Sequence, residues 1–127
     1  MEIASVDIVN GVICNPMSDL VRPAEPIGFA AMAIHHITED MVSDAPLISD
    51  VIGKYLGADA YVAHNAAFDK GKLPQITAPW ICTLKLARKL YPQFESHGNQ
   101  YLRYRLGLKP EVPEGLYAHR ALYDCYV

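Results

Sequence analysis

Two six-residue segments carry the polar side chains whose types and spacing could do chemistry. The first runs from His64 to Asp69 and reads HNAAFD, and the second runs from His119 to Asp124 and reads HRALYD. Carboxylates that gather in a cleft repel one another, and hard divalent cations such as Mg²⁺ or Mn²⁺ stabilise such a gathering. A histidine beside it can be neutral near pH 7 and accept a proton from water bound to the ion. The two segments therefore predict a metal-assisted site.

Each of these residues also has a simpler interpretation. An aspartate in the first turn of a helix is usually a cap or a partner of the helix dipole. A His-Asn pair at the end of a strand is as often part of a turn, and a histidine before a helix is often a capping or surface residue. The repetition of the same His-to-Asp spacing favours the functional interpretation of both segments.

Both segments are expected at the start of a helix. A short apolar run at residues 59–63 predicts a strand that ends at His64, and the Ala-Ala-Phe-Asp-Lys that follows suits the first turn of a helix. The final helix is expected to begin near His119 and to be still running at the last residue of the sequence. Asp69 and Asp124 then each belong to a helix with apolar neighbours, so that either side chain could face a cleft.

The rest of the chain alternates between strand and helix patterns. The Asn10-Gly11 pair between two apolar runs predicts a β-hairpin. Prolines at 23 and 26 predict an extended connector at about residues 22–27, because each disfavours helix in the residue before it. Gly107 is expected to cap a helix. Further helices are expected at about 29–34, 39–42, 47–56, 84–90 and 99–106, and a buried strand at 80–82.

This element order predicts a mixed α/β sheet flanked by helices in one domain spanning residues 1–127. The hairpin and the 59–63 strand are expected in the same sheet. With 127 residues, 51% of them hydrophobic, the chain has room for one core. Charged and polar residues interrupt every apolar run well before the roughly 20 residues of a membrane span, which predicts a cytoplasmic protein.

Cysteine and charge usage narrow the class of protein further. Cys14, Cys82 and Cys125 are far apart and form no CxxC pair, so neither a disulfide framework nor a zinc knuckle is expected, and all three are predicted to be reduced core residues. Residues 1–53 hold one basic and eight acidic side chains (−7), whereas residues 54–127 hold ten and six (+4), which together give −3. The second part could face phosphate, although such charges often form only solvated helix faces.

These motifs resemble those of a known family. HNAAFD is similar to the second motif, and HRALYD to the third motif, of the DEDDh branch of the DnaQ-like 3′-to-5′ exonucleases. The resemblance covers nearly the whole chain, and the two motifs in this order are specific. Other matching segments are Asn15–Ser18, Ala33–Thr38, Trp80–Arg88, Asn99–Leu106 and Ala118–Tyr126.

The resemblance implies an RNase H-like fold and a role for several residues. Asp69 and Asp124 correspond to carboxylates of the metal site, and His119 corresponds to the general base. These three side chains are expected to meet in one cleft. Candidate substrate contacts in the same cleft are His35, His64 and Asn65.

The reaction implied by the family is phosphodiester hydrolysis assisted by two metal ions, Mg²⁺ or Mn²⁺. The expected products are 5′-mononucleotides released from the 3′ end of single- or double-stranded DNA. No short motif distinguishes DNA from RNA, because that choice depends on contacts to the 2′-hydroxyl group.

One family feature is absent from the sequence. The first motif of the family, Asp-x-Glu on the first strand, has no counterpart, since neither Glu2 nor Asp7 has the required spacing. The chain is therefore expected to lack the first strand and the end of the last helix, and to be inactive by itself. Two alternatives remain: a non-catalytic module that binds nucleic acid or another subunit, and an unrelated α/β protein with chance motifs.

Overall fold

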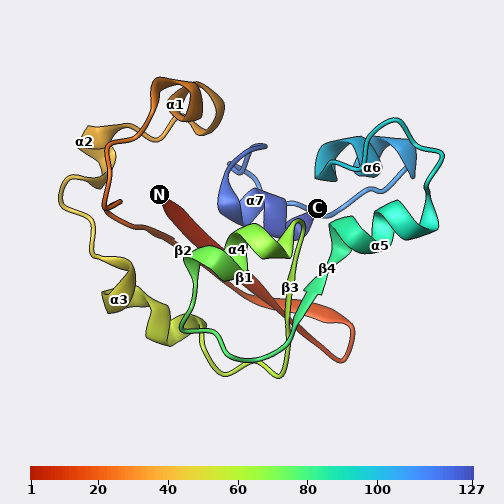
Figure 1. The fold of residues 1–127 in the computed structure, drawn as a ribbon, viewed down its shortest axis with the longest axis horizontal. Helices are drawn as coiled ribbons and strands as arrows, with labels where there is room; N and C mark the ends of the chain where they lie inside the picture. The colour runs from red at the N-terminus through yellow and green to blue at the C-terminus, as the bar shows by residue number, and fades with distance from the viewer. The chain divides into compact units, whose positions relative to one another are not determined.

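The computed structural model describes residues 1–127 (Figure 1). The contacts between residues divide the chain into two compact units. Unit 1 comprises Met1–Lys54 and Pro110–Val127, and unit 2 comprises Tyr55–Lys109.

Unit 1 opens with the predicted hairpin. Strand β1 (Glu2–Val9) pairs antiparallel with strand β2 (Val12–Leu20). The turn residues Asn10 and Gly11 have φ values of 51° and 78°, and two positive φ values define the mirror-image turn that matches the twist of a hairpin. The Asn10-Gly11 prediction is therefore confirmed.

Short helices follow the hairpin in unit 1, close to where the sequence predicts them. They are α1 (Phe29–His35), α2 (Glu39–Val42) and α3 (Ile48–Val51), with a 3₁₀ segment η1 (Ile52–Tyr55) directly after α3. The helix expected at 47–56 thus forms in two pieces. Helix α7 (Ala121–Tyr126) contacts β1 and β2 (Figure 1). The most deeply buried side chains of the unit are Val21, Ile37 and Val42.

Unit 2 contains two strands, and each is followed directly by a helix. Its elements are β3 (Tyr61–Ala63), α4 (Ala66–Lys72), β4 (Trp80–Cys82), α5 (Thr83–Leu90) and α6 (Asn99–Arg105). Strands β3 and β4 pair in parallel. Helix α6 ends at a glycine cap as predicted: Gly107 has φ 65°, and the Leu108 N–H donates to the Arg103 carbonyl at 2.8 Å.

Two expectations about the fold are wrong. The hairpin and the strand predicted at 59–63 do not share a sheet, because β1 pairs only with β2 and β3 only with β4. A strand hydrogen-bonded to both pairs would be needed to join them, and none of the four strands takes that place.

The cysteines are free but not in the core: Cys14 is exposed on the two-stranded hairpin, and Cys82 and Cys125 are half-buried. No helix is long and apolar enough to cross a membrane.

Candidate functional site

The first motif of unit 2 lies where β3 turns into α4. Asn65 is the residue before the helix and adopts a left-handed backbone conformation with φ 77° and ψ 47°. Asparagine tolerates this conformation better than most residues, so the chain can reverse here within one residue. The turn places Asp69 in the first part of α4, as the sequence predicts.

Asp69 is a half-buried carboxylate without a cationic partner. Burial raises its pKa, and the only opposing contribution is a hydrogen bond from its own backbone. Its side chain takes part in neither of the two ion pairs of the chain. A nearby positive charge, such as that of a metal ion, would stabilise the ionised form of this carboxylate. A role of Asp69 as a metal ligand stays a prediction.

Asp69→Asn is therefore expected to stabilise the metal-free chain at neutral pH. A raised pKa means that ionised Asp69 costs folding free energy once the pH exceeds that pKa, and that the cost is absent below the ordinary value of 3.8, where both states are protonated. Thermal unfolding of both proteins from pH 3 to pH 8 measures this. An Asp69→Asn variant that is less stable than the parent at pH 7 would contradict the prediction.

His64 is held by hydrogen bonds within unit 2. Its Nε2 lies 2.7 Å from the His97 carbonyl oxygen, and its Nδ1 lies 3.0 Å from the Thr83 hydroxyl oxygen. Because a carbonyl only accepts, Nε2 carries the proton in the neutral ring. The single proton of the Thr83 hydroxyl is shared between His64 Nδ1 and the Ala63 carbonyl oxygen, which lies 3.4 Å from the hydroxyl oxygen. Substrate binding by His64 stays a prediction, and both ring nitrogens already have protein partners.

A hollow of about 200 Å³ in unit 2 is lined by residues outside the predicted site. Lys70 of α4 and Lys85 of α5 line it together with Trp80 and Cys82. The pKa of the Cys82 thiol is lowered, chiefly by the Lys85 backbone N–H and further by N–H groups at the starts of α4 and α5. Trp80 and Cys82 belong to β4, and Lys70 and Lys85 belong to helices that each follow a strand, so only this order of strand and helix could have indicated the arrangement from sequence.

The second motif lies in unit 1, in the turn before α7. His119 is exposed and has a left-handed backbone with φ 67°, a conformation that residues other than glycine rarely adopt. Arg120 is the residue before the helix, and its carbonyl accepts the Asp124 N–H at 3.1 Å. Asp124 is half-buried within α7, so the helix places it as the sequence predicts.

Glu2 at the start of β1 anchors this turn. Its carboxylate accepts hydrogen bonds from Arg120 Nε at 2.9 Å, Arg120 Nη2 at 2.8 Å and the Ala121 N–H at 2.8 Å, and from the Ser18 hydroxyl at 3.3 Å. Four donors occupy the acceptor sites of one carboxylate. Glu2 is therefore engaged as a structural anchor, which agrees with its lack of the Asp-x-Glu spacing.

The Glu2 anchor is expected to make unit 1 sensitive to acid. Burial alone would raise the Glu2 pKa, but the hydrogen bonds from Arg120 and Ala121 outweigh it and lower the pKa. The stabilisation is thus complete above the ordinary value of 4.5 and is lost as the pH falls through the lowered pKa. Glu2→Gln should cost on the order of 2 kcal/mol at pH 7 and progressively less in acid, measured by denaturant unfolding. A cost that stays constant down to pH 2 would contradict this.

His35, at the end of α1, lies within electrostatic reach of the same anchor. Its pKa is lowered, first by burial and then by the positive charges of the Met1 amino group and Arg120, while Glu2 acts in the opposite direction. Its Nδ1 accepts the Ile37 N–H at 3.0 Å, which is the contact of a neutral ring.

The predicted site residues are thus divided between the units. Unit 1 holds His35, His119 and Asp124, and unit 2 holds His64, Asn65 and Asp69. Convergence of the two sets on one cleft stays a prediction. No group of three or more His, Cys, Asp or Glu side chains could hold a metal ion. Carboxylates are the right kind of donor for Mg²⁺ or Mn²⁺, but their number falls short of a two-ion site.

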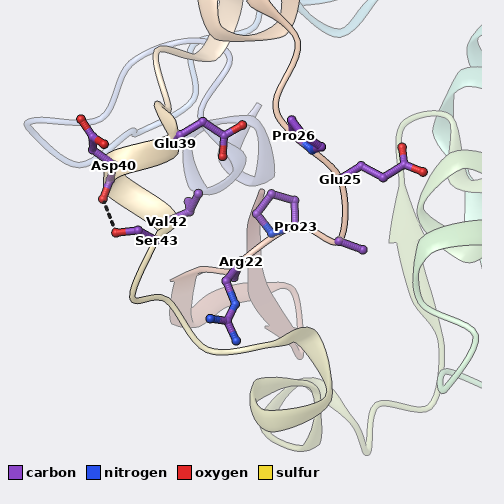
Figure 2. A pocket seen from close by; sticks show the side chains of 9 residues that line it. Arg22, Pro23, Glu25, Pro26, Glu39, Asp40, Val42 and Ser43 are labelled. Carbon is purple, nitrogen blue, oxygen red and sulfur yellow. Dashed lines mark hydrogen bonds between the residues drawn. The ribbon is translucent and has the colours of Figure 1, made fainter.

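A larger hollow in unit 1, of about 380 Å³, contains none of the predicted residues (Figure 2). The 22–26 connector and α2 line it. Figure 2 shows the Glu39 side chain pointing toward the connector and a hydrogen bond between Ser43 and Asp40. The Glu39 carboxylate accepts the Ile27 N–H, and the Ser43 hydroxyl donates to the Asp40 carbonyl at 3.0 Å. These polar groups have partners within the protein and indicate a structural role.

Comparison with known proteins identifies the family. The family model RNase_T, described as an exonuclease, matches residues 1–127. Exodeoxyribonuclease 10 of Escherichia coli (strain K12) is 55% identical over 127 residues, which are 100% of this chain and 57% of that protein. The PolC-type DNA polymerase III of Bacillus subtilis (strain 168) is 34% identical over 137 residues, covering 98% of this chain and 9% of the polymerase.

A solved structure of Exonuclease X in complex with 5′ overhanging duplex DNA matches the fold with a TM-score of 0.94 and 56% sequence identity. The match covers 98% of this chain and 75% of that one. It confirms the mixed α/β, RNase H-like fold class. The chain spans a little over half the length of the E. coli exodeoxyribonuclease, 57%. With a family match over all 127 residues, the resemblance drawn from HNAAFD and HRALYD is confirmed, and the chain belongs to the RNase_T exonuclease family.

Proposed function

We propose that this chain forms part of a 3′-to-5′ exonuclease that hydrolyses DNA from the 3′ end and releases 5′-mononucleotides. The observation that carries the proposal is the exonuclease family match over residues 1–127, which includes both His-to-Asp segments. The related Exonuclease X structure contains duplex DNA with a 5′ overhang. Such a duplex has a recessed 3′ end, which is the end that the proposed reaction would consume.

The charge of the two units supports DNA as the substrate. Unit 2 contains eight Lys and Arg side chains against three Asp and Glu (+5), and unit 1 contains three against eleven (−8), which together give −3. Phosphate contacts depend on Lys and Arg, so unit 2 is the proposed source of contacts to the DNA backbone.

Exonucleases of this family generally use divalent metal ions. We propose Mg²⁺ or Mn²⁺ as the ions, with Asp69 and Asp124 as two of their ligands. Two adjacent divalent ions repel each other, and several anionic oxygens must offset that repulsion. Two carboxylates are too few, so the proposed site needs an Asp-x-Glu strand, and the 127 residues by themselves are proposed to be inactive or nearly so.

His119 is the proposed general base. Its ring is exposed in the turn before α7, where it could reach a water molecule beside the DNA phosphate. A neutral imidazole accepts a proton from water near pH 7, which makes the oxygen a better nucleophile toward phosphorus. His35, His64 and Asn65 are proposed to contact the substrate.

The proposal can be tested with an extended chain, defined as residues 1–127 preceded by a strand that carries an Asp-x-Glu motif. This protein is incubated with a duplex bearing a recessed 3′ end and Mg²⁺ or Mn²⁺, and the products are separated by chromatography. Nucleoside 5′-monophosphates, absent when a chelator is added, are expected. Release of oligonucleotides from internal positions would instead indicate an endonuclease.

A non-catalytic module that binds nucleic acid or another subunit is the second candidate. The observations that favour it are the basic excess of unit 2 and the lack of any three-ligand group in the chain. DNA binding by the extended chain, measured by fluorescence anisotropy, without hydrolysis under any metal condition would support this candidate over the exonuclease.

A further inference from the structure

Glu2 and Arg120 form the most extensively bonded ion pair of the chain. Both Arg120 Nε and Nη2 donate to the one carboxylate, at 2.9 Å and 2.8 Å, in the two-pronged geometry that makes Arg-carboxylate pairs strong. The Arg120 side chain is only 20% exposed and the Glu2 side chain 9%, so water weakens the pair little. The chain's other ion pair, Lys54 with Asp19, is more exposed at 49% and 21%.

The pair fixes a segment of five residues around His119. On one side, Arg120 Nη1 donates to the Tyr117 hydroxyl at 2.9 Å, and its guanidinium group lies over the Tyr117 ring at 5.5 Å. On the other side, the Ala121 N–H donates to Glu2 Oε2 at 2.8 Å. Residues on both sides of His119 are therefore bound to the same anchor at the start of β1.

His119 itself has a backbone conformation that needs such support. A positive φ at a residue other than glycine costs on the order of 1–3 kcal/mol and persists where the surrounding structure enforces it. The Arg120 N–H also donates to the Tyr117 carbonyl at 3.3 Å, which closes a turn over Ala118 and His119, and the Glu2–Arg120 pair holds the end of that turn against β1. The charges of Arg120 and Glu2 also act on His35, a second predicted site residue of unit 1.

We propose that Glu2 and Arg120 are positioning residues, whose double hydrogen bond holds His119 in its left-handed conformation and thereby sets the direction of its ring. The inference rests on the proposed function, in which His119 accepts the proton. A merely structural ion pair would stabilise unit 1 without affecting the orientation of His119.

The first test is independent of activity and uses the 127-residue chain. NMR reports a positive φ through a strong cross-peak between the His119 amide and its own Hα and through the His119 carbon shifts. We expect this signature in the parent and in the control Asp19→Asn, which breaks the other ion pair of unit 1. We expect it to be lost in Glu2→Gln and Arg120→Met, and weakened in Arg120→Lys, which keeps the charge but loses the two-pronged contact. Retention of the positive φ in Glu2→Gln would overturn the proposal.

The second test uses the extended chain at a temperature where circular dichroism shows every variant folded. Glu2→Gln and Arg120→Met should lower kcat about ten- to a hundredfold with little change in KM, because a misplaced catalytic group slows chemistry more than binding. Arg120→Lys should recover part of the loss, and Asp19→Asn should stay within about twofold of the parent. If Arg120→Met does not fold, the kcat values of Glu2→Gln and Arg120→Lys are compared with that of the parent instead.

The outcomes separate the inference from the proposed function. Full activity in Glu2→Gln, together with low activity in His119→Asn, would overturn the positioning role while leaving the general base in place. Equal losses in Glu2→Gln and Asp19→Asn would also overturn it, because they would indicate general destabilisation. Full activity in His119→Asn would refute the base assignment itself, and the positioning role with it.

Discussion

Adding an Asp-x-Glu strand to the 127-residue chain is expected to raise its exonuclease rate by about a thousandfold or more. Metal ions stabilise the charge of such a transition state by several kcal/mol, and each 1.36 kcal/mol is a factor of about ten. The chain itself offers Asp69 and Asp124 but no group of three metal ligands. Nucleotide release by both proteins is measured at equal concentration with Mg²⁺, Mn²⁺ and chelator.

The matched control adds the same strand with its two acidic residues replaced by Asn and Gln. This control completes the fold without supplying ligands, and it should remain as slow as the 127-residue chain. Rapid hydrolysis by the control, or by the chain alone, would show that two carboxylates suffice for catalysis.

Replacing His119 by Asn in the extended chain is expected to lower kcat about a hundredfold or more, which is the usual contribution of general base catalysis. Asparagine is the informative substitution because it tolerates the left-handed backbone of residue 119 and cannot accept the proton. DNA affinity and the thermal midpoint should be nearly unchanged. His119→Ala would add backbone strain to the chemical effect, so a larger loss of stability is expected there.

A change of less than about threefold in kcat for His119→Asn would exclude His119 as the base. A parallel loss of DNA binding would instead place its ring in substrate contact. Gly107→Asn, which also occupies a left-handed position but lies in the cap of α6, serves as a control for backbone effects.

Local structure could be predicted from the sequence where one or two residues determine the backbone. Asn10 and Gly11 specify the hairpin because both readily adopt positive φ, and Gly107 specifies the end of α6 for the same reason. The prediction of one helix at 47–56 was less accurate. Its period of apolar residues indicates a helical segment but does not reveal that the second half tightens into a 3₁₀ turn.

The sheet could not be predicted, because pairing depends on which strands are present as neighbours. The apolar run at 59–63 predicts a strand correctly, but nothing local shows that it pairs with Trp80–Cys82 and not with the hairpin. Cys14 illustrates the same limit: an apolar residue in a strand is buried only when something covers its face of the sheet.

The site was predictable in its residue types and not in its supporting contacts. Spacing identifies Asp69, Asp124 and His119, and the structure adds the helix starts that hold them. The Glu2–Arg120 bond links positions 118 residues apart, and no sequence pattern shows such a partner. The occupied ring nitrogens of His64 likewise depend on His97, 33 residues away.

The direction of degradation is the most direct test of the central claim. Two duplexes of the same sequence with a recessed 3′ end are prepared, one labelled at the 3′-terminal nucleotide and one at the 5′ end of the same strand. The extended chain should release the 3′ label at once as a mononucleotide, while the 5′ label appears first in a ladder of progressively shorter strands. Immediate release of the 5′ label, or cleavage in the middle of both strands, would contradict a 3′-to-5′ exonuclease.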